Sequence, residues 1–323
     1  MRPEARETAL PFVSELVGSA IRLLDDEVPI ADVRLLNTAV REVAHAFRVF
    51  GRYRHVRKIT TFGSARLPDG DPVCLQAEEF SRRIADAGFM VITGGGGGVM
   101  RACQKGAGRE RSFGINIRLP FEQRANEFIA DDAKLVTLKY FFTRKLLFMK
   151  EADAIVLFPG GFGTLDEGFE ALTLIQTGKT PPIPIVLLDA PGGSYWKAWF
   201  EHADDLVRIG LVSPEDLSLF RVTDDVDVAV SEIRSFYRVF HSTRYVGDKL
   251  VIRLQHPISD RTLQRLHDEF SDLLASGVFQ VGNALPEEYQ DETASLPRLV
   301  LHFNRANFGR LRQMIDVVNS SDS

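Results

Sequence analysis

The sequence has few cysteines and no long apolar run, and both absences limit what the chain can be. Its 323 residues include only two cysteines, Cys74 and Cys103. They show no metal-ligand spacing, so we expect reduced thiols in a cytoplasmic protein. No apolar stretch is long enough to span a bilayer, and residues 1–7 lack the apolar core of a signal peptide. These absences favour a cytoplasmic location and no membrane partner.

Several catalytic motifs are also missing. The seven histidines show no H-E-x-x-H or other metal spacing, and the G-x-S-x-G elbow of α/β-hydrolases does not occur. No lysine is marked as a pyridoxal phosphate site, so we expect neither a metal nor another cofactor. The net charge of −5 and the pI of about 5.9 give no overall attraction to nucleic acid. A local basic patch is still compatible with these totals.

The middle of the chain alternates between apolar strands and amphipathic helices. Helical periodicity covers residues 8–50, where two or three helices are expected to lead into a sheet and cover it. Strands are predicted at 58–62, 89–93, 112–117, 134–138, 154–158 and 183–188. Helices are predicted at 72–87, 99–108, 140–151, 169–175, 196–209 and 226–240. This alternation predicts an α/β protein with a Rossmann-like, doubly wound parallel sheet, which binds ligands beyond the carboxyl ends of its strands.

The pattern changes near residue 242. Strands are predicted at 250–254, 278–281 and 299–303, helices at 259–275 and 308–318, and a polar, acidic loop at 286–295. The β-α-β-β-α order predicts a small C-terminal α+β module of the ferredoxin-like class. We therefore expect an N-terminal helical segment (1–56), a Rossmann-like domain (57–241) and this module (242–323).

The stretch from Pro159 to Glu167 is a glycine-rich turn between a strand and a helix. Its three glycines let the backbone approach a ligand, and N–H groups at the helix start can bind ligand oxygens. Glu167 lies about one turn into that helix, where its carboxylate could take part in catalysis. The spacing of Thr164 and Glu167 equally matches a capping box. From spacing alone the two roles are evenly balanced, and they can coexist.

A second glycine-rich turn covers residues 94–98 and is followed by Val99 and Met100. It is not a dinucleotide fingerprint, because Val99 and Arg101 occupy the positions where Gly or Ala is required, and it lacks the G-K-[ST] ending of a P-loop. It predicts a cradle of N–H groups for a phosphate or similar anion. A dianionic phosphate would be repelled by Glu167, so we expect the phosphate at this second turn.

Three further polar residues are candidates. Arg144 and Lys145 interrupt an otherwise apolar helix, and burial of a cation there is costly without an anionic partner. One of the pair can extend to solvent while the other forms a structural ion pair, or Arg144 can face a ligand phosphate or Glu167. The functional role is favoured for Arg144 over Lys145. Ser64 follows the first strand, where it can contact a ligand or simply form a turn.

Together these segments resemble the LOG (LONELY GUY) family, formerly labelled lysine decarboxylases. The family's P-G-G-x-G-T-x-x-E loop matches residues 159–167, its R-K pair matches 144–145, and its G-G-G-x-G-x-M loop matches 94–100. The runs at 114–117 and 119–123 resemble the longer bacterial branch. The resemblance covers residues 57–240 and leaves out the N-terminal helices and the C-terminal module.

The resemblance implies a Rossmann-like fold, a homo-oligomer and a phosphoribohydrolase, which cleaves the N-glycosidic bond of AMP or of an N6-modified AMP. It makes Arg144 and Glu167 the catalytic pair. Substrate contacts are then expected from Ser64, Gly94, Gly95, Gly96, Gly97, Gly98, Val99, Met100, Asn116, Lys145, Pro159, Gly160, Gly161, Gly163 and Thr164. One alternative is a non-catalytic carrier of a phosphorylated ligand, which needs the loops but not Glu167. A DNA-processing protein would require a basic face, and the net negative charge of the chain argues against this alternative.

Overall fold

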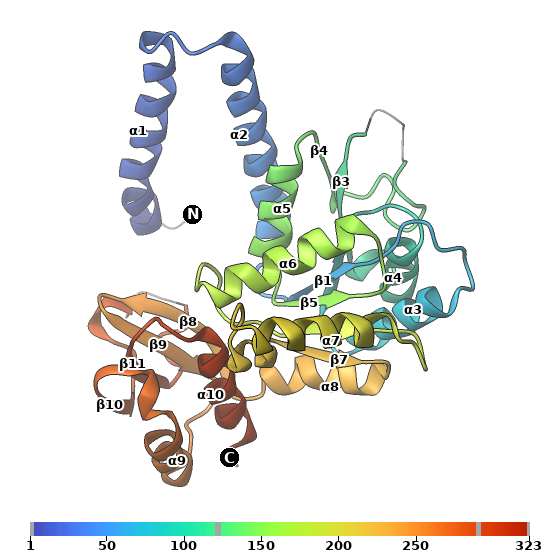
Figure 1. Cartoon of the computed structure of the whole chain (residues 1–323). Coiled ribbons are helices and arrows are strands. Elements are labelled where there is room, and N and C mark those ends of the chain that lie inside the picture. The colour runs from blue at the N-terminus through green and yellow to red at the C-terminus, as the bar shows by residue number, and fades with distance from the viewer. Residues whose placement is uncertain (1–2, 120–123, 289–291, 322–323) are drawn as a thin grey trace.

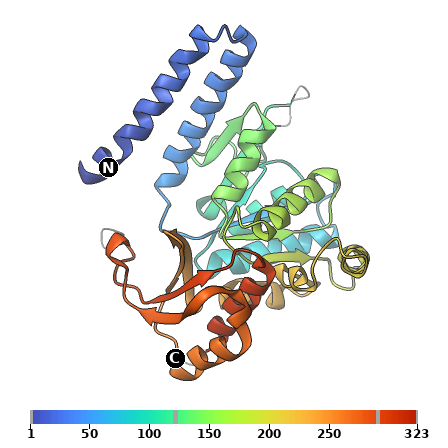
Figure 2. The same ribbon diagram turned by 60° about the vertical axis from the view of Figure 1, so that its left-hand side comes forward.

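Two helices precede the first strand, as the N-terminal periodicity predicted. The structure, a computed structural model, describes residues 3–119, 124–288 and 292–321. α1 (Pro3–Asp25) and α2 (Ile30–Gly51) run side by side as an antiparallel pair (Figure 1). α2 buries Ala46 and Phe50 in the core, whereas α1 stands away from the sheet in both views (Figure 2). Of these two helices, α2 therefore covers the sheet and α1 does not.

The described part of the chain forms a seven-stranded sheet. Its strands are β1 (Lys58–Phe62), β2 (Met90–Thr93), β3 (Ser112–Ile117), β4 (Leu135–Leu138), β5 (Ala154–Leu157), β6 (Ile185–Leu188) and β7 (Phe220–Thr223). They pair in the order β4-β3-β2-β1-β5-β6-β7, and every pair is parallel. The predicted fold class is confirmed. β7 was not predicted, because this partly exposed edge strand has no continuous apolar run.

Helices cover both faces of the parallel sheet, as a doubly wound fold requires. On one face lie α3 (Pro72–Asp86), α4 (Val99–Ala107) and α8 (Val226–Phe236). On the other face lie α2, α5 (Phe141–Lys150), α6 (Phe162–Gln176) and α7 (Tyr195–Arg208). Cys74 and Cys103 are free thiols buried on the first face, and burial raises the pKa of each to about 11. These thiols are expected to be unreactive.

The order in which strands are added to the sheet reverses between β1 and β5. Strands β2, β3 and β4 extend the sheet on one side of β1, and β6 and β7 extend it on the other side of β5. Neighbouring connections at such a switch point leave on opposite faces and open a crevice at the carboxyl ends of the strands. Both glycine-rich turns follow strands near this point, so the topology brings them to the same edge of the sheet.

A second sheet forms the C-terminal module. Its elements are β8 (Phe240–Val246), β9 (Lys249–Leu254), α9 (Asp260–Phe270), β10 (Leu274–Gly282), β11 (Arg298–Phe303) and α10 (Phe308–Ser320). The strands pair antiparallel in the order β10-β11-β9-β8. Since β11 lies between β9 and β10, the unit β9-α9-β10 is a split β-α-β, as in ferredoxin-like folds. Short 3₁₀ turns occupy Arg109–Arg111, Pro214–Leu219, Ser271–Leu273 and Pro286–Glu288.

Two predicted helices of this region were too long. The helix predicted to reach residue 240 ends at Phe236, and Phe240 begins β8, which was not predicted. The helix predicted at 259–275 ends at Phe270, and β10 begins at Leu274. In both places apolar residues continue beyond the helix. They pack into the core of the C-terminal module, a contact that periodicity along the chain does not reveal.

The acidic segment after β10 contains a buried charge. Glu288, only 1% exposed, accepts hydrogen bonds from Arg253 (3.0 and 3.2 Å) and Arg298 (3.1 Å). Burial acts to raise the pKa of Glu288, but the two guanidinium groups outweigh it and hold the pKa below its ordinary value. The prediction of a mobile loop is therefore wrong at Glu288. Residues 289–291 of that prediction lie outside the described residues, as do residues 120–123 of the run that resembles the bacterial branch.

The module attaches to the amino ends of the parallel strands. Asp153 accepts hydrogen bonds from Arg57 (3.1 Å) and from the backbone N–H of Lys58 (2.9 Å). Arg57 also donates to the carbonyl of His241 (3.1 Å) and stacks on Tyr237, whose hydroxyl donates to the carbonyl of Asp153. The C-terminal module thus contacts the edge of the sheet opposite the crevice. In the ranges that the structure describes, every helix is too short or too polar to cross a lipid bilayer.

Candidate active site

A cavity of about 760 Å³ opens at the carboxyl ends of β1 and β5. The turn after β1 and the turn between β5 and α6 form its walls, and α5 contributes Phe141, Arg144 and Phe148. The second glycine turn contributes Gly94, and the first turn of α4 contributes Met100. The cavity therefore lies at the switch point of the sheet, the place where doubly wound folds bind ligands.

Ser64 connects the two glycine-rich turns. Its backbone N–H donates to the carbonyl of Pro159 (3.1 Å), and its own carbonyl accepts from the N–H of Val99 (2.9 Å). Gly98, at φ +58°, allows the second contact, because a β-carbon there would lie 2.3 Å from the carbonyl oxygen of Ser64. On the other side, a β-carbon on Gly160 would lie 2.1 Å from Oγ1 of Thr164. Several of these glycines thus serve close packing, which holds three loops in one arrangement.

Arg144 is fixed by contacts on three sides. Its Nε donates to the carbonyl of Ile115 (3.0 Å), and its guanidinium lies over the ring of Phe148 at 5.0 Å. The missing side chain of Gly94 makes room for Nη2. Burial lowers the pKa of Arg144, and the charge of Glu167 opposes this effect. Arg144 is thus a positioned cation that faces the cavity and interacts with Glu167.

Glu167 is not part of a capping box. Helix α6 begins at Phe162, and its N-cap is Gly161, which forms no side-chain cap. Thr164 therefore lies inside the first turn and Glu167 in the second. The helix starts earlier than predicted because Gly161 occupies the N-cap position, so Thr164 does not cap the helix. The capping role is wrong, and the carboxylate is left available to the cavity.

The carboxylate of Glu167 is buried and incompletely paired. The residue is 6% exposed, and among the described residues its Oε2 accepts no hydrogen bond. Nζ of Lys145 lies 3.4 Å from Oε2, within ion-pair distance. Burial raises the pKa of Glu167, while the charges of Lys145 and Arg144 oppose the rise. A desolvated carboxylate of this kind in the lining of a cavity is typical of catalytic sites.

Lys145 lies beside this carboxylate but does not line the cavity. Its Nζ is also 2.9 Å from Asp166 and 2.7 Å from Glu170. Although partial burial acts to lower the pKa of Lys145, its hydrogen bonds with these carboxylates raise the pKa overall. Lys145 is the member of the R-K pair that makes the ion pairs, and it holds a positive charge next to Glu167.

Comparison with known proteins shows the family of the chain. A family model described as possible lysine decarboxylase matches residues 86–233. A cytokinin riboside 5′-monophosphate phosphoribohydrolase from Mycobacterium tuberculosis (strain ATCC 25618 / H37Rv) is 31% identical over 160 residues, which are 48% of this chain and 81% of the relative. The chain belongs to the LOG family.

A plant relative matches a shorter part of this chain. A probable phosphoribohydrolase of the same name, LOGL5 from Oryza sativa subsp. japonica, is 29% identical over 143 residues, which are 43% of this chain and 55% of the relative. The chain thus matches about half the length of that plant protein. Among solved structures, a molybdenum cofactor carrier protein from Chlamydomonas reinhardtii is 22% identical over 55% of this chain and 96% of its own, with a TM-score of 0.40.

The LOG motifs divide between residues that line the cavity and residues that support it. The predicted residues in the lining are Ser64, Gly94, Met100, Arg144, Gly160, Gly161, Gly163, Thr164 and Glu167. Those outside the lining are Gly95, Gly96, Gly97, Gly98, Val99, Asn116, Lys145 and Pro159. Asn116, for example, turns its side-chain oxygen to the backbone N–H of Ile117 (2.9 Å). The substrate contacts of all these residues stay predictions.

The sequence did not mark the other residues of the lining, which are Thr61, Phe62, Gly63, Ala65, Arg66, Phe141, Phe148, Phe162, Leu165 and Asp166. Phe162 is the variable position of the LOG loop, and its signal in the sequence was an aromatic residue between two glycines. In the structure it is 92% exposed. Arg66 follows Ser64 by two residues, and its N–H donates to the hydroxyl of Ser64 (3.1 Å). A cation directly after the first strand was the available signal for this residue.

Proposed function

We propose that the protein is a nucleoside 5′-monophosphate phosphoribohydrolase. It hydrolyses the N-glycosidic bond of AMP or of an N6-modified AMP and releases the free base and ribose 5-phosphate. The observation that carries this proposal is the buried carboxylate of Glu167 in the lining of the cavity that also holds Arg144 and a helix N-terminus. The printed names of the LOG relatives support the same reaction.

The phosphate of the substrate binds at the N-terminus of α6 in this proposal. Gly161, Phe162 and Gly163 line the cavity, and the N–H groups of a first helical turn have no partner within the helix. The hydroxyl of Ser64 and the cation of Arg66 lie in the same lining. This position replaces the expected one at residues 94–98, because of that turn only Gly94 reaches the cavity.

Charge repulsion between phosphate and Glu167 does not exclude this position. Helix α6 rises about 1.5 Å per residue, so Glu167 lies roughly 7 Å along the axis from Phe162. A ribose fits between a phosphate at the helix start and the carboxylate further along. The sugar is then held by its phosphate while its anomeric carbon meets Glu167.

The chemistry follows from the charge that develops during bond cleavage. Breaking the bond between ribose and base builds positive charge on the sugar, as in glycoside hydrolysis. The carboxylate of Glu167 stabilises this charge and orients the attacking water. The charges of Lys145 and Arg144 favour the ionised form of Glu167 against the effect of burial, and Arg144 donates a hydrogen bond toward the departing base. The rigid contacts of Arg144 hold this donor in place before the substrate binds.

Release of free base decides between this reaction and the carrier alternative. Wild type and Glu167→Gln are incubated with AMP and with an N6-modified AMP, and binding of each nucleotide is measured in parallel. We expect base release by wild type, and a loss of about a hundredfold or more in the variant with binding retained. Equal release by both proteins would contradict the role of Glu167. Binding without release by wild type would favour the non-catalytic carrier.

We also propose that the chain self-associates. Large apolar side chains of α1 are exposed, and in a monomer they would remain in water. They are Leu10, Phe12, Val13, Leu16, Val17, Ile21 and Leu24. A second copy that lays its own helix pair against this surface would bury them in a bundle. Light scattering after size exclusion tests this, with Val17→Glu expected to shift the protein toward monomer and a monomeric wild type counting against it.

A further inference from the structure

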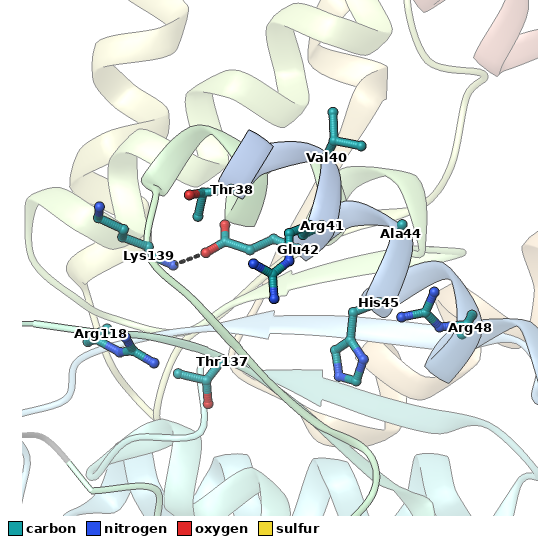
Figure 3. Close-up of a pocket in the computed structure, with 10 residues that line it drawn as sticks. All are labelled: Thr38, Val40, Arg41, Glu42, Ala44, His45, Arg48, Arg118, Thr137 and Lys139. Carbon is teal, nitrogen blue, oxygen red and sulfur yellow. Dashed lines mark hydrogen bonds between the residues drawn. The ribbon is translucent and has the colours of Figure 1, made fainter. Parts of the chain in front are cut away.

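A second hollow lies between α2 and the edge strand β4. Its volume is about 580 Å³, and it shares no lining residue with the active-site cavity. Arg41, His45 and Arg48 line it from one side of α2, and their spacing of four and three residues places them on one face of the helix. Figure 3 shows Arg41 and His45 extending from α2, and Arg118 and Thr137 side by side across from that helix.

Positive charge dominates this groove. In the part of the chain that the structure describes, no ion pair is found for Arg41, Arg48 or Arg118. The carboxylate of the groove is Glu42, and both of its oxygens are already engaged. Oε1 accepts from the backbone N–H of Lys139 (2.6 Å), and Oε2 accepts from the hydroxyl of Thr143 (2.9 Å). Glu42 therefore offers little to the three arginines that surround the space.

Such a cluster suits one class of ligand. Guanidinium groups bind phosphate oxygens through paired, charge-assisted hydrogen bonds, and three of them around one space match a ligand with several charges. The space is the size of a small-molecule site. The chain as a whole has a net charge of −5, so general attraction of anions does not account for the cluster.

We propose that the groove between α2 and β4 binds a small, multiply charged phosphate compound. Glu42 links this site to the active site, because it holds the start of α5 through Lys139 and Thr143, and Arg144 follows directly after Thr143. A phosphate bound next to Glu42 would disturb the hydrogen bonds through which Glu42 joins α2 to the start of α5. The second part of the proposal is therefore that binding changes the rate of base release.

Calorimetric titration with tripolyphosphate, pyrophosphate and inorganic phosphate tests the site. Wild type is compared with Arg41→Ala/Arg48→Ala and with Arg34→Ala/Arg52→Ala, a control that removes two exposed arginines of the same helix region from outside the groove. We expect the groove variant to bind tripolyphosphate at least about tenfold more weakly than wild type and the control to bind as wild type does. Equal binding by all three proteins, or equal weakening in both variants, would overturn the site.

The active-site cavity is the other place where such a probe can bind. Titrations are therefore repeated with saturating AMP, in Glu167→Gln if wild type consumes the nucleotide. Binding that AMP abolishes and the groove variant retains belongs to the cavity and overturns the groove assignment. For the second part, base release is measured with and without tripolyphosphate. A rate that changes in wild type and not in the groove variant supports the coupling, and an unchanged wild-type rate overturns it.

Discussion

A β-carbon on Gly94 would lie 2.3 Å from Nη2 of Arg144 and 2.7 Å from the sulfur of Met100. Arg144 is held on its other sides by Ile115 and Phe148, so its guanidinium can yield only by moving into the cavity. We predict that Gly94→Ala displaces the guanidinium and lowers kcat/KM for base release by about a hundredfold. Steady-state kinetics measure the loss, and circular dichroism checks that the fold is kept.

Gly97→Ala is the informative comparison in the same turn. Its β-carbon would meet only the carbonyl of Ala65 at 3.5 Å, an ordinary contact, and Gly97 does not line the cavity. If the turn acts through packing around Arg144, Gly97→Ala keeps most of the activity. If instead the turn cradles the phosphate, as the glycine run alone predicted, both variants lose affinity for the nucleotide.

The pH dependence of catalysis reports on Glu167. Because burial raises the pKa of this carboxyl, the ionised form that the reaction needs disappears at a higher pH than for an ordinary glutamate. We predict that the acidic limb of the kcat/KM profile lies above about pH 4.3, the usual value for a glutamate side chain. A profile that stays flat down to that pH would contradict an essential, buried carboxylate.

The same pKa predicts a gain in stability for Glu167→Gln. The folded state binds the proton more tightly than the unfolded state, so the free energy of unfolding falls as the pH rises from the unfolded pKa through the folded one. The charged carboxylate therefore costs stability at neutral pH, and glutamine avoids that cost. Thermal unfolding should show a higher Tm for the variant at pH 7 and no difference below about pH 4.

Lys145 is predicted to act through Glu167 rather than on the substrate. Lys145→Met removes the cation 3.4 Å from Oε2, which is one of the two charges that oppose the effect of burial. The pKa of Glu167 then rises further, so the acidic limb of the rate profile moves to higher pH. Lys145→Arg keeps the charge and should keep the profile. An unchanged limb in Lys145→Met, with KM raised instead, would indicate direct substrate binding.

Glu288 is predicted to stabilise the C-terminal module. Glu288→Gln leaves Arg298 buried without its counter-charge, which costs about 3 kcal/mol of unfolding free energy. Since the native pKa is depressed, the stabilisation exists above the unfolded pKa and is lost as the pH falls through the native one. Urea unfolding at neutral and acidic pH measures both effects. Its exposed neighbour serves as the control, and Glu287→Gln should have no effect.

The fold was largely predictable where one element carries its own signal. The buried parallel strands Lys58–Phe62 and Ser112–Ile117 are short segments with β-branched and aromatic residues, and their predicted limits are the observed ones. The predictions of secondary structure failed where tertiary contacts determine the conformation. β7 is an edge strand of mixed polarity, and the stretch after Phe236 continues a helical pattern yet enters the second sheet.

The candidate site was predictable as a set of motifs but not as a geometry. The order of the strands brings the two glycine turns, Arg144 and Glu167 to one cavity, and that order cannot be read from spacing along the chain. The capping box failed for a local reason, because Gly161 begins the helix before Thr164 is reached. The spacing of Arg41, His45 and Arg48 marks one face of α2 in the sequence, but only the fold brings Arg118 and β4 to that face.

The contacts of Arg57, Asp153 and Tyr237 determine on which side of the protein the C-terminal module lies. They tie the module to the amino ends of the strands, while the cavity opens at their carboxyl ends. A fusion partner or a sensor surface attached through this module would leave the cavity mouth facing solution. The protein can thus be tethered in one defined orientation, with nucleotide reaching it from the free side.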